Sequence, residues 1–138
     1  MSAFTRDDIV AAARAWLGTP YWHQASLKGV GCDCLGLVRG VWREIVGAEP
    51  EPMRPYSADW AEAGAGETLI ELGERYFHRV ASRQWREGDV LLFRWRAGLV
   101  AKHAAILSGE TTMIHAHDGA AVAEVGLTPW WRRRLAYA

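Results

Sequence analysis

The chain has 138 residues, half of them hydrophobic, and its 16 basic and 16 acidic side chains give a formal net charge of zero. This composition suits one compact domain over residues 1–138, without the basic excess of a nucleic-acid-binding domain. No apolar run reaches the roughly 18 residues of a membrane helix. The polar start of the chain, residues 2–8, predicts no signal peptide, so we expect synthesis in the cytoplasm.

The first half of the chain has the apolar spacing that is typical of amphipathic helices. This spacing predicts three helices, over residues 6–17, 34–46 and 67–80. Thr5 and Asp8 have the form of a capping box at the start of the first helix, and Gly18 is a plausible end for it. Asp33 is a natural N-cap for the second helix. The prolines and glycines of residues 48–66 predict a long surface loop before the third helix.

The second half changes to short apolar runs separated by turns, which is typical of antiparallel strands. These runs predict strands over residues 90–93, 103–107, 112–115 and 121–125. Thr128 and Pro129 resemble an N-cap followed by the first position of a short helix. Helices followed by hairpin strands predict an α+β domain, with an antiparallel sheet packed on the helix that begins at Cys34.

Cys32 and Cys34 are the only cysteines in the chain. They are too close in sequence for an ordinary disulfide bridge, so we expect at least one free thiol. A helix N-terminus favours a thiolate, and its backbone N–H groups can bind a developing oxyanion. This position makes Cys34 a candidate nucleophile, against the common alternative that a free cysteine is a small core residue.

Two histidines supply the other parts of a thiol-dependent hydrolase. His103 opens one predicted strand and His115 closes the next, so a hairpin places both at neighbouring strand ends. If the hairpin packs on the helix of Cys34, His103 is the candidate base that takes the thiol proton, and His115 orients its ring. His117 lies two residues further along the chain and is the reserve candidate for the orienting role.

The same cysteines and histidines also suit zinc by residue type, which makes a metal site the rival interpretation. The one-residue gap between the cysteines is shorter than the usual zinc spacing, so we expect no metal and no other cofactor. Tyr21 lies in a turn where tyrosine is commonly a packing residue, but near the nucleophile its phenol would donate to the oxyanion. Tyr21 and Asp33 are therefore the candidates for oxyanion or substrate binding.

Five sequence blocks occur in the order seen in NlpC-type cysteine peptidases, which are circularly permuted papain-like cell-wall hydrolases. The blocks are Gly18-Thr19-Pro20-Tyr21, Cys32-Asp33-Cys34-Leu35-Gly36-Leu37-Val38, Gly88-Asp89-Val90-Leu91-Leu92-Phe93, His103-Ala104-Ala105-Ile106 and Ile114-His115-Ala116. The chain resembles that family over nearly its whole length. The resemblance implies a papain-like fold, with N-terminal helices packed on a central antiparallel β-sheet. By matching position it implies that Cys34 is the nucleophile, His103 the base, His115 the orienter and Tyr21 an oxyanion helper.

Residues 21–24, Tyr-Trp-His-Gln, most resemble the phage-tail and gene-transfer-agent branch of this family. That branch implies a peptidase that cuts peptidoglycan stem peptides, typically between D-γ-glutamate and diaminopimelate. It also implies carriage by tail hub or tip proteins of a phage-like particle, with action in the periplasm. Leu35 stands where the bacterial pattern has serine, and residues 23–25 stand where it has paired glycine. Two alternatives stay open, a tail-tip or baseplate structural module without turnover and a thiol acyltransferase or amidase of the same fold.

Overall fold

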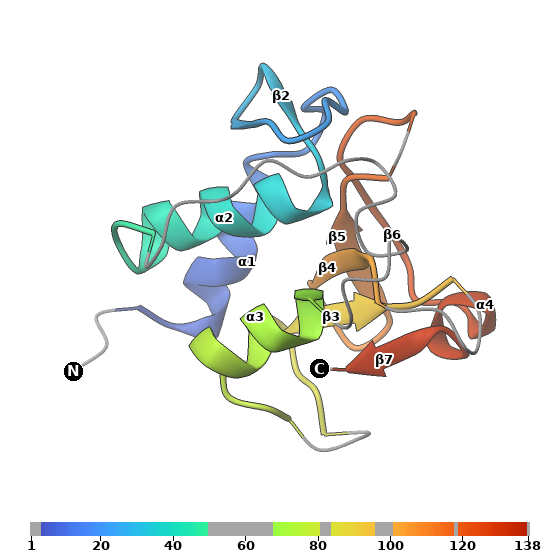
Figure 1. Cartoon of the computed structure of the whole chain (residues 1–138). Helices are drawn as coiled ribbons and strands as arrows, with labels where there is room; N and C mark the ends of the chain where they lie inside the picture. Colours follow the sequence, from blue (N-terminus) through green and yellow to red (C-terminus); the bar gives the residue numbers. More distant parts are fainter. Residues whose placement is uncertain (1–3, 50–67, 81–83, 96–100, 118, 138) are drawn as a thin grey trace.

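The computed structural model describes residues 4–49, 68–80, 84–95, 101–117 and 119–137. Its helices are α1 (Arg6–Arg14), α2 (Cys34–Ile45), α3 (Thr68–Tyr76) and α4 (Pro129–Arg132). Its strands are β1 (Ser26–Leu27), β2 (Gly31–Cys32), β3 (Val90–Phe93), β4 (His103–Leu107), β5 (Thr112–His115), β6 (Ala123–Gly126) and β7 (Leu135–Tyr137). Helices α1, α2 and α3 gather on one side of the molecule, and the larger sheet with α4 lies on the other (Figure 1). Within the described ranges, no helix has the length and apolar character needed to cross a membrane.

Helix α1 begins as its sequence predicts. The hydroxyl of Thr5 accepts the backbone N–H of Asp8 at 3.2 Å, and the carboxylate of Asp8 accepts the N–H of Thr5 at 2.9 Å, which completes the capping box. The helix ends at Arg14, shorter than predicted, and a turn carries the chain to Gly18 at φ +84°. The N–H of Gly18 donates to the carbonyl of Val122 at 2.9 Å. The segment after α1 is therefore hydrogen-bonded to the C-terminal half of the chain.

Helix α2 forms the centre of the core. Its N-cap is Asp33, as predicted, and its apolar face buries Leu37 completely. Gly40 on this helix lies against the indole ring of Trp16, and a Cβ at that position would overlap the ring. The close contact places the segment after α1 directly on α2, and both helices share one apolar core with the sheet.

The larger sheet has the strand order β6-β5-β4-β3-β7, and every neighbouring pair is antiparallel. Alternate residues of β4 belong to different cores: Ala104 and Ile106 pack with α2, whereas Ala105 packs in a second core on the opposite face. Phe93 of β3 pairs with His103 of β4 and belongs to that second core. The predicted α+β class, with a sheet packed on α2, is confirmed.

Several predicted boundaries differ from the structure. Helix α3 ends at Tyr76 rather than at residue 80, and β6 begins two residues later than predicted and ends one later. Strands β1, β2 and β7 were not expected, because they have two or three residues each and their pairing depends on distant chain segments. The predicted loop over residues 48–66 lies outside the described residues from residue 50 onward, as does residue 67 of the predicted third helix.

Candidate active site

The loop before the candidate nucleophile is held down by a buried carboxylate. Asp33 is only 2% exposed; its Oδ1 accepts the N–H of Gly36 and its Oδ2 accepts the N–H of Gln24, both at 2.7 Å. The Nδ1 atom of His23 lies 3.9 Å from the same Oδ2 atom. The predicted capping role of Asp33 is therefore confirmed, whereas its binding of substrate or oxyanion stays a prediction.

Two backbone features allow this loop to lie so close to the helix. Gln24 has a φ of +64°, in the left-handed region that favours glycine, and its bond to Asp33 holds it there. The carbonyl of Ala25 accepts the N–H of Asp33 at 3.3 Å and lies so near Gly36 that a Cβ there would overlap its oxygen. The sequence analysis missed both features; the replacement of the family's paired glycine by residues 23–25 was the available signal.

The thiol of Cys34, at the first position of α2, lies against the start of β4. Its Sγ is 4.0 Å from the carbonyl oxygen of Lys102 and is hydrogen-bonded by the backbone N–H of Ala104, so it contacts the backbone on both sides of His103. Burial and the carboxylate of Asp33 raise the pKa of the Cys34 thiol to about 12, although the Ala104 N–H acts in the opposite direction. The resting sulfur is therefore a neutral thiol, in contrast to the thiolate that a helix N-terminus alone favours.

The two predicted histidines meet across the β4–β5 hairpin. The Nε2 atom of His103 and the Nδ1 atom of His115 are 2.8 Å apart, and the side chains are buried, with 3% and 6% of each residue exposed. Burial and the two neighbouring histidines lower the pKa of His103 well below its usual value. Burial, with a smaller effect of His117, lowers the pKa of His115 to about 4. Both rings are therefore neutral at pH 7.

This hydrogen bond decides which nitrogen of His103 is available for chemistry. A neutral imidazole has one donor and one acceptor nitrogen. A base must present a lone pair, and the Nε2 atom of His103 is already bonded to His115. If His103 is the base, its free lone pair is therefore on Nδ1, and its Nε2–H donates to Nδ1 of His115. The roles of base and orienter stay predictions, but the bond favours His115 over His117, whose ring lies 5.7 Å from each of the other two.

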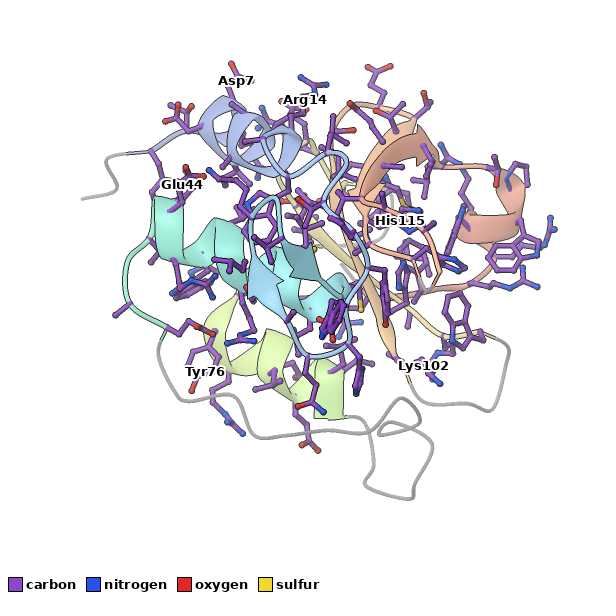
Figure 2. All side chains as sticks on the ribbon, turned by 90° about the horizontal axis from the view of Figure 1, so that it is seen from above. Asp7, Arg14, Glu44, Tyr76, Lys102 and His115 are labelled. Atoms are coloured by element: carbon purple, nitrogen blue, oxygen red, sulfur yellow. The ribbon has the colours of Figure 1, made fainter. Side chains whose placement is uncertain are left out.

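Two tryptophans that the sequence analysis did not select surround this pair. Trp95 follows β3 and Trp131 lies on α4; their rings stack on the ring of His103 at centroid distances of 5.3 and 5.4 Å. Trp131 also meets His115 edge-on at 5.2 Å. Figure 2 labels His115 in the half of the molecule that holds the sheet and α4. The distance of both tryptophans in sequence from the histidines left no local pattern that indicated the contact.

The remaining candidates lie close to the nucleophile along the backbone. Tyr21 is half-buried and lies in a parallel bridge with Cys32, in which Cys32 donates to Pro20 and accepts from Trp22, both at 3.0 Å. Tyr21 packs against the core beside α2, and its role as an oxyanion donor stays a prediction. Cys32 is fully buried, and this burial, with Asp33, raises the pKa of its thiol to about 12. In the described part of the chain, no three histidine, cysteine or acidic side chains are placed to hold a metal ion.

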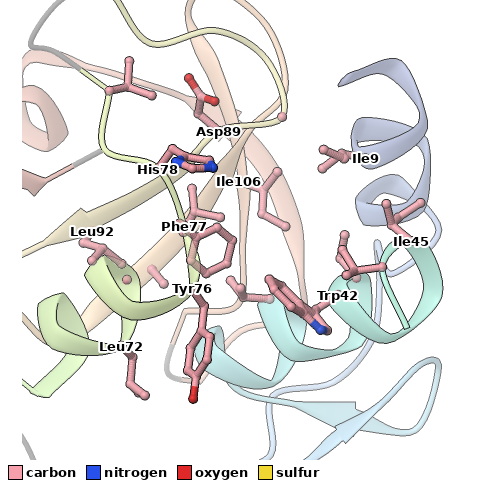
Figure 3. A pocket seen from close by; sticks show the side chains of 18 of the residues that line it. Ile9, Trp42, Ile45, Leu72, Tyr76, Phe77, His78, Asp89, Leu92 and Ile106 are labelled. Atoms are coloured by element: carbon pink, nitrogen blue, oxygen red, sulfur yellow. The ribbon is translucent and has the colours of Figure 1, made fainter. Parts of the chain in front are cut away.

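An apolar cavity of about 590 Å³ lies between α2, α3, the start of α1 and the sheet (Figure 3). Leu35 and Ala104, the chain neighbours of Cys34 and His103, form part of its wall. Side chains of α2 and α3 form another part, including Trp42, Leu72 and Tyr76. The cavity therefore extends to the first turn of α2 and the start of β4, next to Cys34 and His103 in the chain.

The arrangement contains the residue types that thiol acyl transfer would use: a cysteine at a helix N-terminus, a neighbouring strand that begins with His103, and His115 hydrogen-bonded to His103. A protein-family model described as the NlpC/P60 family matches residues 18–137, which is most of the chain. The chain belongs to the NlpC/P60 family.

Curated NlpC/P60 relatives include the "Murein DD-endopeptidase MepS/Murein LD-carboxypeptidase" of Escherichia coli strains K12 and O157:H7. Each is 30% identical to this chain over 120 residues, which are 86% of this chain and 54% of the relative. The chain thus spans about half the length of the curated relatives it matches.

Solved structures agree on the fold. An NlpC/P60 family protein from Bacillus cereus matches with a TM-score of 0.68 and 21% identity over 97% of this chain and 39% of its own. The NlpC/p60 domain of the peptidoglycan hydrolase SagA matches with a TM-score of 0.64 and 23% identity over 97% of both chains. NlpC1 from Trichomonas vaginalis matches with a TM-score of 0.66 and 16% identity over 99% of this chain and 43% of its own. These likenesses confirm the predicted papain-like NlpC/P60 fold.

Proposed function

We propose that this protein is a cysteine endopeptidase that hydrolyses the stem peptides of peptidoglycan. The observation that carries the proposal is the position of the Cys34 thiol against the backbone on both sides of His103, whose ring is hydrogen-bonded to His115. Family membership and the murein endopeptidase among the relatives support peptidoglycan as the substrate class.

The neutral resting groups set the first step of the mechanism. Nδ1 of His103 takes the thiol proton while the sulfur of Cys34 attacks the scissile carbonyl carbon, so the thiolate forms only with the substrate in place. The carbonyl oxygen becomes an oxyanion, which backbone N–H groups at the start of α2 would bind, with the phenol of Tyr21 as a further donor. His115 holds the imidazolium ring in position through the Nε2–Nδ1 hydrogen bond.

The second half of the reaction returns the protein to its starting state. The imidazolium gives its proton to the leaving amine, the C–N bond breaks, and a thioester remains on Cys34. Water then attacks the thioester carbon with His103 as base, and the C–S bond breaks as the sulfur regains its proton. The products are a free amine and a carboxylate.

We infer that the scissile bond joins D-γ-glutamate to diaminopimelate, as the match of residues 21–24 to the phage-tail branch implies. The names of the curated relative, a DD-endopeptidase and an LD-carboxypeptidase, supply two further bonds to test. The same match supports carriage by tail hub or tip proteins of a phage-like particle to the periplasm, after synthesis in the cytoplasm. A structural tail module without turnover is the alternative that the experiment below excludes or establishes.

Mass spectrometry of defined muropeptides incubated with the protein identifies the bond that is cut. We expect Cys34→Ala and His103→Ala to abolish cleavage while far-UV circular dichroism stays that of the natural protein. Cys32→Ala is the matched control, because it removes the neighbouring buried thiol and leaves Cys34 in place. Full cleavage by Cys34→Ala would refute the mechanism, and no cleavage by the natural protein, combined with binding to tail hub proteins, would establish the structural alternative.

A further inference from the structure

Two indole rings lie against the imidazole ring of His103, and neither takes part in its hydrogen bond to His115. The indole rings of Trp95 and Trp131 are nearly parallel to the imidazole, with interplanar angles of 26° and 27° and centroid distances of 5.3 and 5.4 Å. The two indoles come from separate elements and lie 5.9 Å from each other. Two tryptophan faces therefore converge on the ring that the proposed mechanism protonates.

The proposed reaction creates a positive charge on this buried ring. In a triad whose third member is a carboxylate, that group carries a negative charge that stabilises the imidazolium. Here the hydrogen-bond partner is His115, a neutral imidazole, which orients the ring but supplies no charge. Asp33, the carboxylate beside the nucleophile, bonds the backbone N–H groups of Gln24 and Gly36. Within the described residues, no carboxylate is hydrogen-bonded to His103, so the imidazolium would gain from another source of stabilisation.

An indole face supplies such stabilisation, because the face of its π system is negative and attracts a cation within about 6 Å of the ring centroid. Tryptophan is the strongest of the aromatic side chains in this role, and the attraction increases where water is excluded. Both indoles are within that distance of His103, which is 3% exposed.

We propose that the indole faces of Trp95 and Trp131 stabilise the imidazolium form of His103 during catalysis. They supply the attraction that a carboxylate supplies in other triads and that the neutral His115 does not supply. This inference rests on the proposed function, because it concerns the same proton transfer. Trp95 and Trp131 are positioning residues here, since they act on the reaction through His103. Trp131 has a second contact in this set, edge-on to His115 at 5.2 Å.

Site-specific incorporation of mono-, di- and trifluorotryptophan at position 131, and separately at position 95, tests the proposal. Fluorine withdraws electron density from the indole face and leaves its shape nearly unchanged, so packing is preserved while the attraction for a cation falls. We expect log kcat/KM for muropeptide cleavage to decrease steadily with the number of fluorines, by roughly 3- to 30-fold across the series. Thermal midpoints measured for each protein check that the fold is unchanged.

Trp85 is the matched control, because it packs beside the same second core as Trp131. The same fluorinated series at position 85 should leave kcat/KM unchanged. A series that is flat at both 95 and 131, or one that declines equally at position 85, would overturn the proposal.

A second readout separates this inference from the proposed function. The rate at which iodoacetamide alkylates Cys34 near neutral pH depends on the same transfer of a proton to His103, and it needs no peptidoglycan. We expect this rate to decrease along the series at positions 95 and 131. A decrease in alkylation without muropeptide cleavage by any form of the protein would retain the inference and reject the function. Muropeptide cleavage combined with an alkylation rate that does not change with fluorination would retain the function and reject the inference.

Discussion

The buried histidine pair makes the stability of the fold depend on pH in a predictable direction. The pKa of His115 is lowered to about 4 and that of His103 is lowered well below its usual value, in both cases chiefly by burial. The unfolded chain therefore binds protons near pH 6.5, whereas the folded chain does not. Between pH 6.5 and the lowered pKa of His115, about 4, the unfolded state binds more protons than the folded state. The free energy of unfolding therefore falls as the pH falls.

The size of the effect follows from the shift of His115 alone. A shift from 6.5 to about 4 removes between about 2 and 3 kcal/mol of stability as the pH falls from about 7.5 to about 4.5. His103 adds to this loss in the same direction. Glu49, whose pKa is lowered chiefly by its bond to Arg39, and Glu124, lowered chiefly by its bond to Arg14, lose stabilising charge only at lower pH.

Urea denaturation at a series of pH values measures this dependence, with His115→Gln as the comparison. Glutamine keeps a hydrogen-bonding side chain but does not titrate, so its profile should lose between about 2 and 3 kcal/mol less on acidification than the natural protein. The variant is expected to be less stable near neutral pH, because the bond to His103 is altered. Parallel profiles for the two proteins would show that His115 is not held neutral by burial, and would refute the argument.

Four other outcomes follow from the structure. Gly36→Ala places a Cβ in the carbonyl of Ala25, so it should cost about 3 kcal/mol or more in urea denaturation; a cost below that of an ordinary surface change would contradict the close approach. Gly73→Ala on α3 meets Leu92 at an ordinary 3.5 Å and should instead add about 0.5–1 kcal/mol of stability, and a loss of stability would contradict the helix. Asp33→Ala removes both the cap and the bond to Gln24, which should cost about 2–3 kcal/mol, and Asp33→Asn less. Because the pKa of the Cys34 thiol is raised to about 12, its alkylation rate should still rise as the pH increases above about 9, and a plateau below that would show a thiolate at rest.

Local sequence patterns were sufficient to predict the elements that carry the candidate catalytic residues. The capping box at Thr5 and the N-cap at Asp33 are made by residues within three positions of each other, so they are visible before folding. The short apolar runs at residues 90–93, 103–107 and 112–115 predicted β3, β4 and β5 with the bounds that the structure shows. Because these elements are regular, the meeting of His103 and His115 followed from one hairpin.

The features that escaped prediction depend on contacts between distant segments. Strand β7 pairs with β3 through Phe93 and Leu135, which are far apart in the chain, and three residues have no periodicity to reveal such a pairing. Trp95 and Trp131 reach His103 only after the sheet and α4 have packed. The raised pKa of the Cys34 thiol also involves a distant segment, because the sulfur contacts the backbone at the start of β4. The helix N-terminus considered alone favours a thiolate instead.

The alternation of side chains between the two faces of β4 limits which sequence changes this protein can tolerate. One strand places the imidazole of His103 against Trp131 at the second core, while the two peptide groups that flank this residue contact the sulfur of Cys34. A slip of β4 by a single position would exchange the two faces, placing the imidazole among the helices and Ala104 among the indoles. Deletions or insertions of one residue within 103–107 should therefore remove all the reacting groups together, whereas point changes weaken them one at a time.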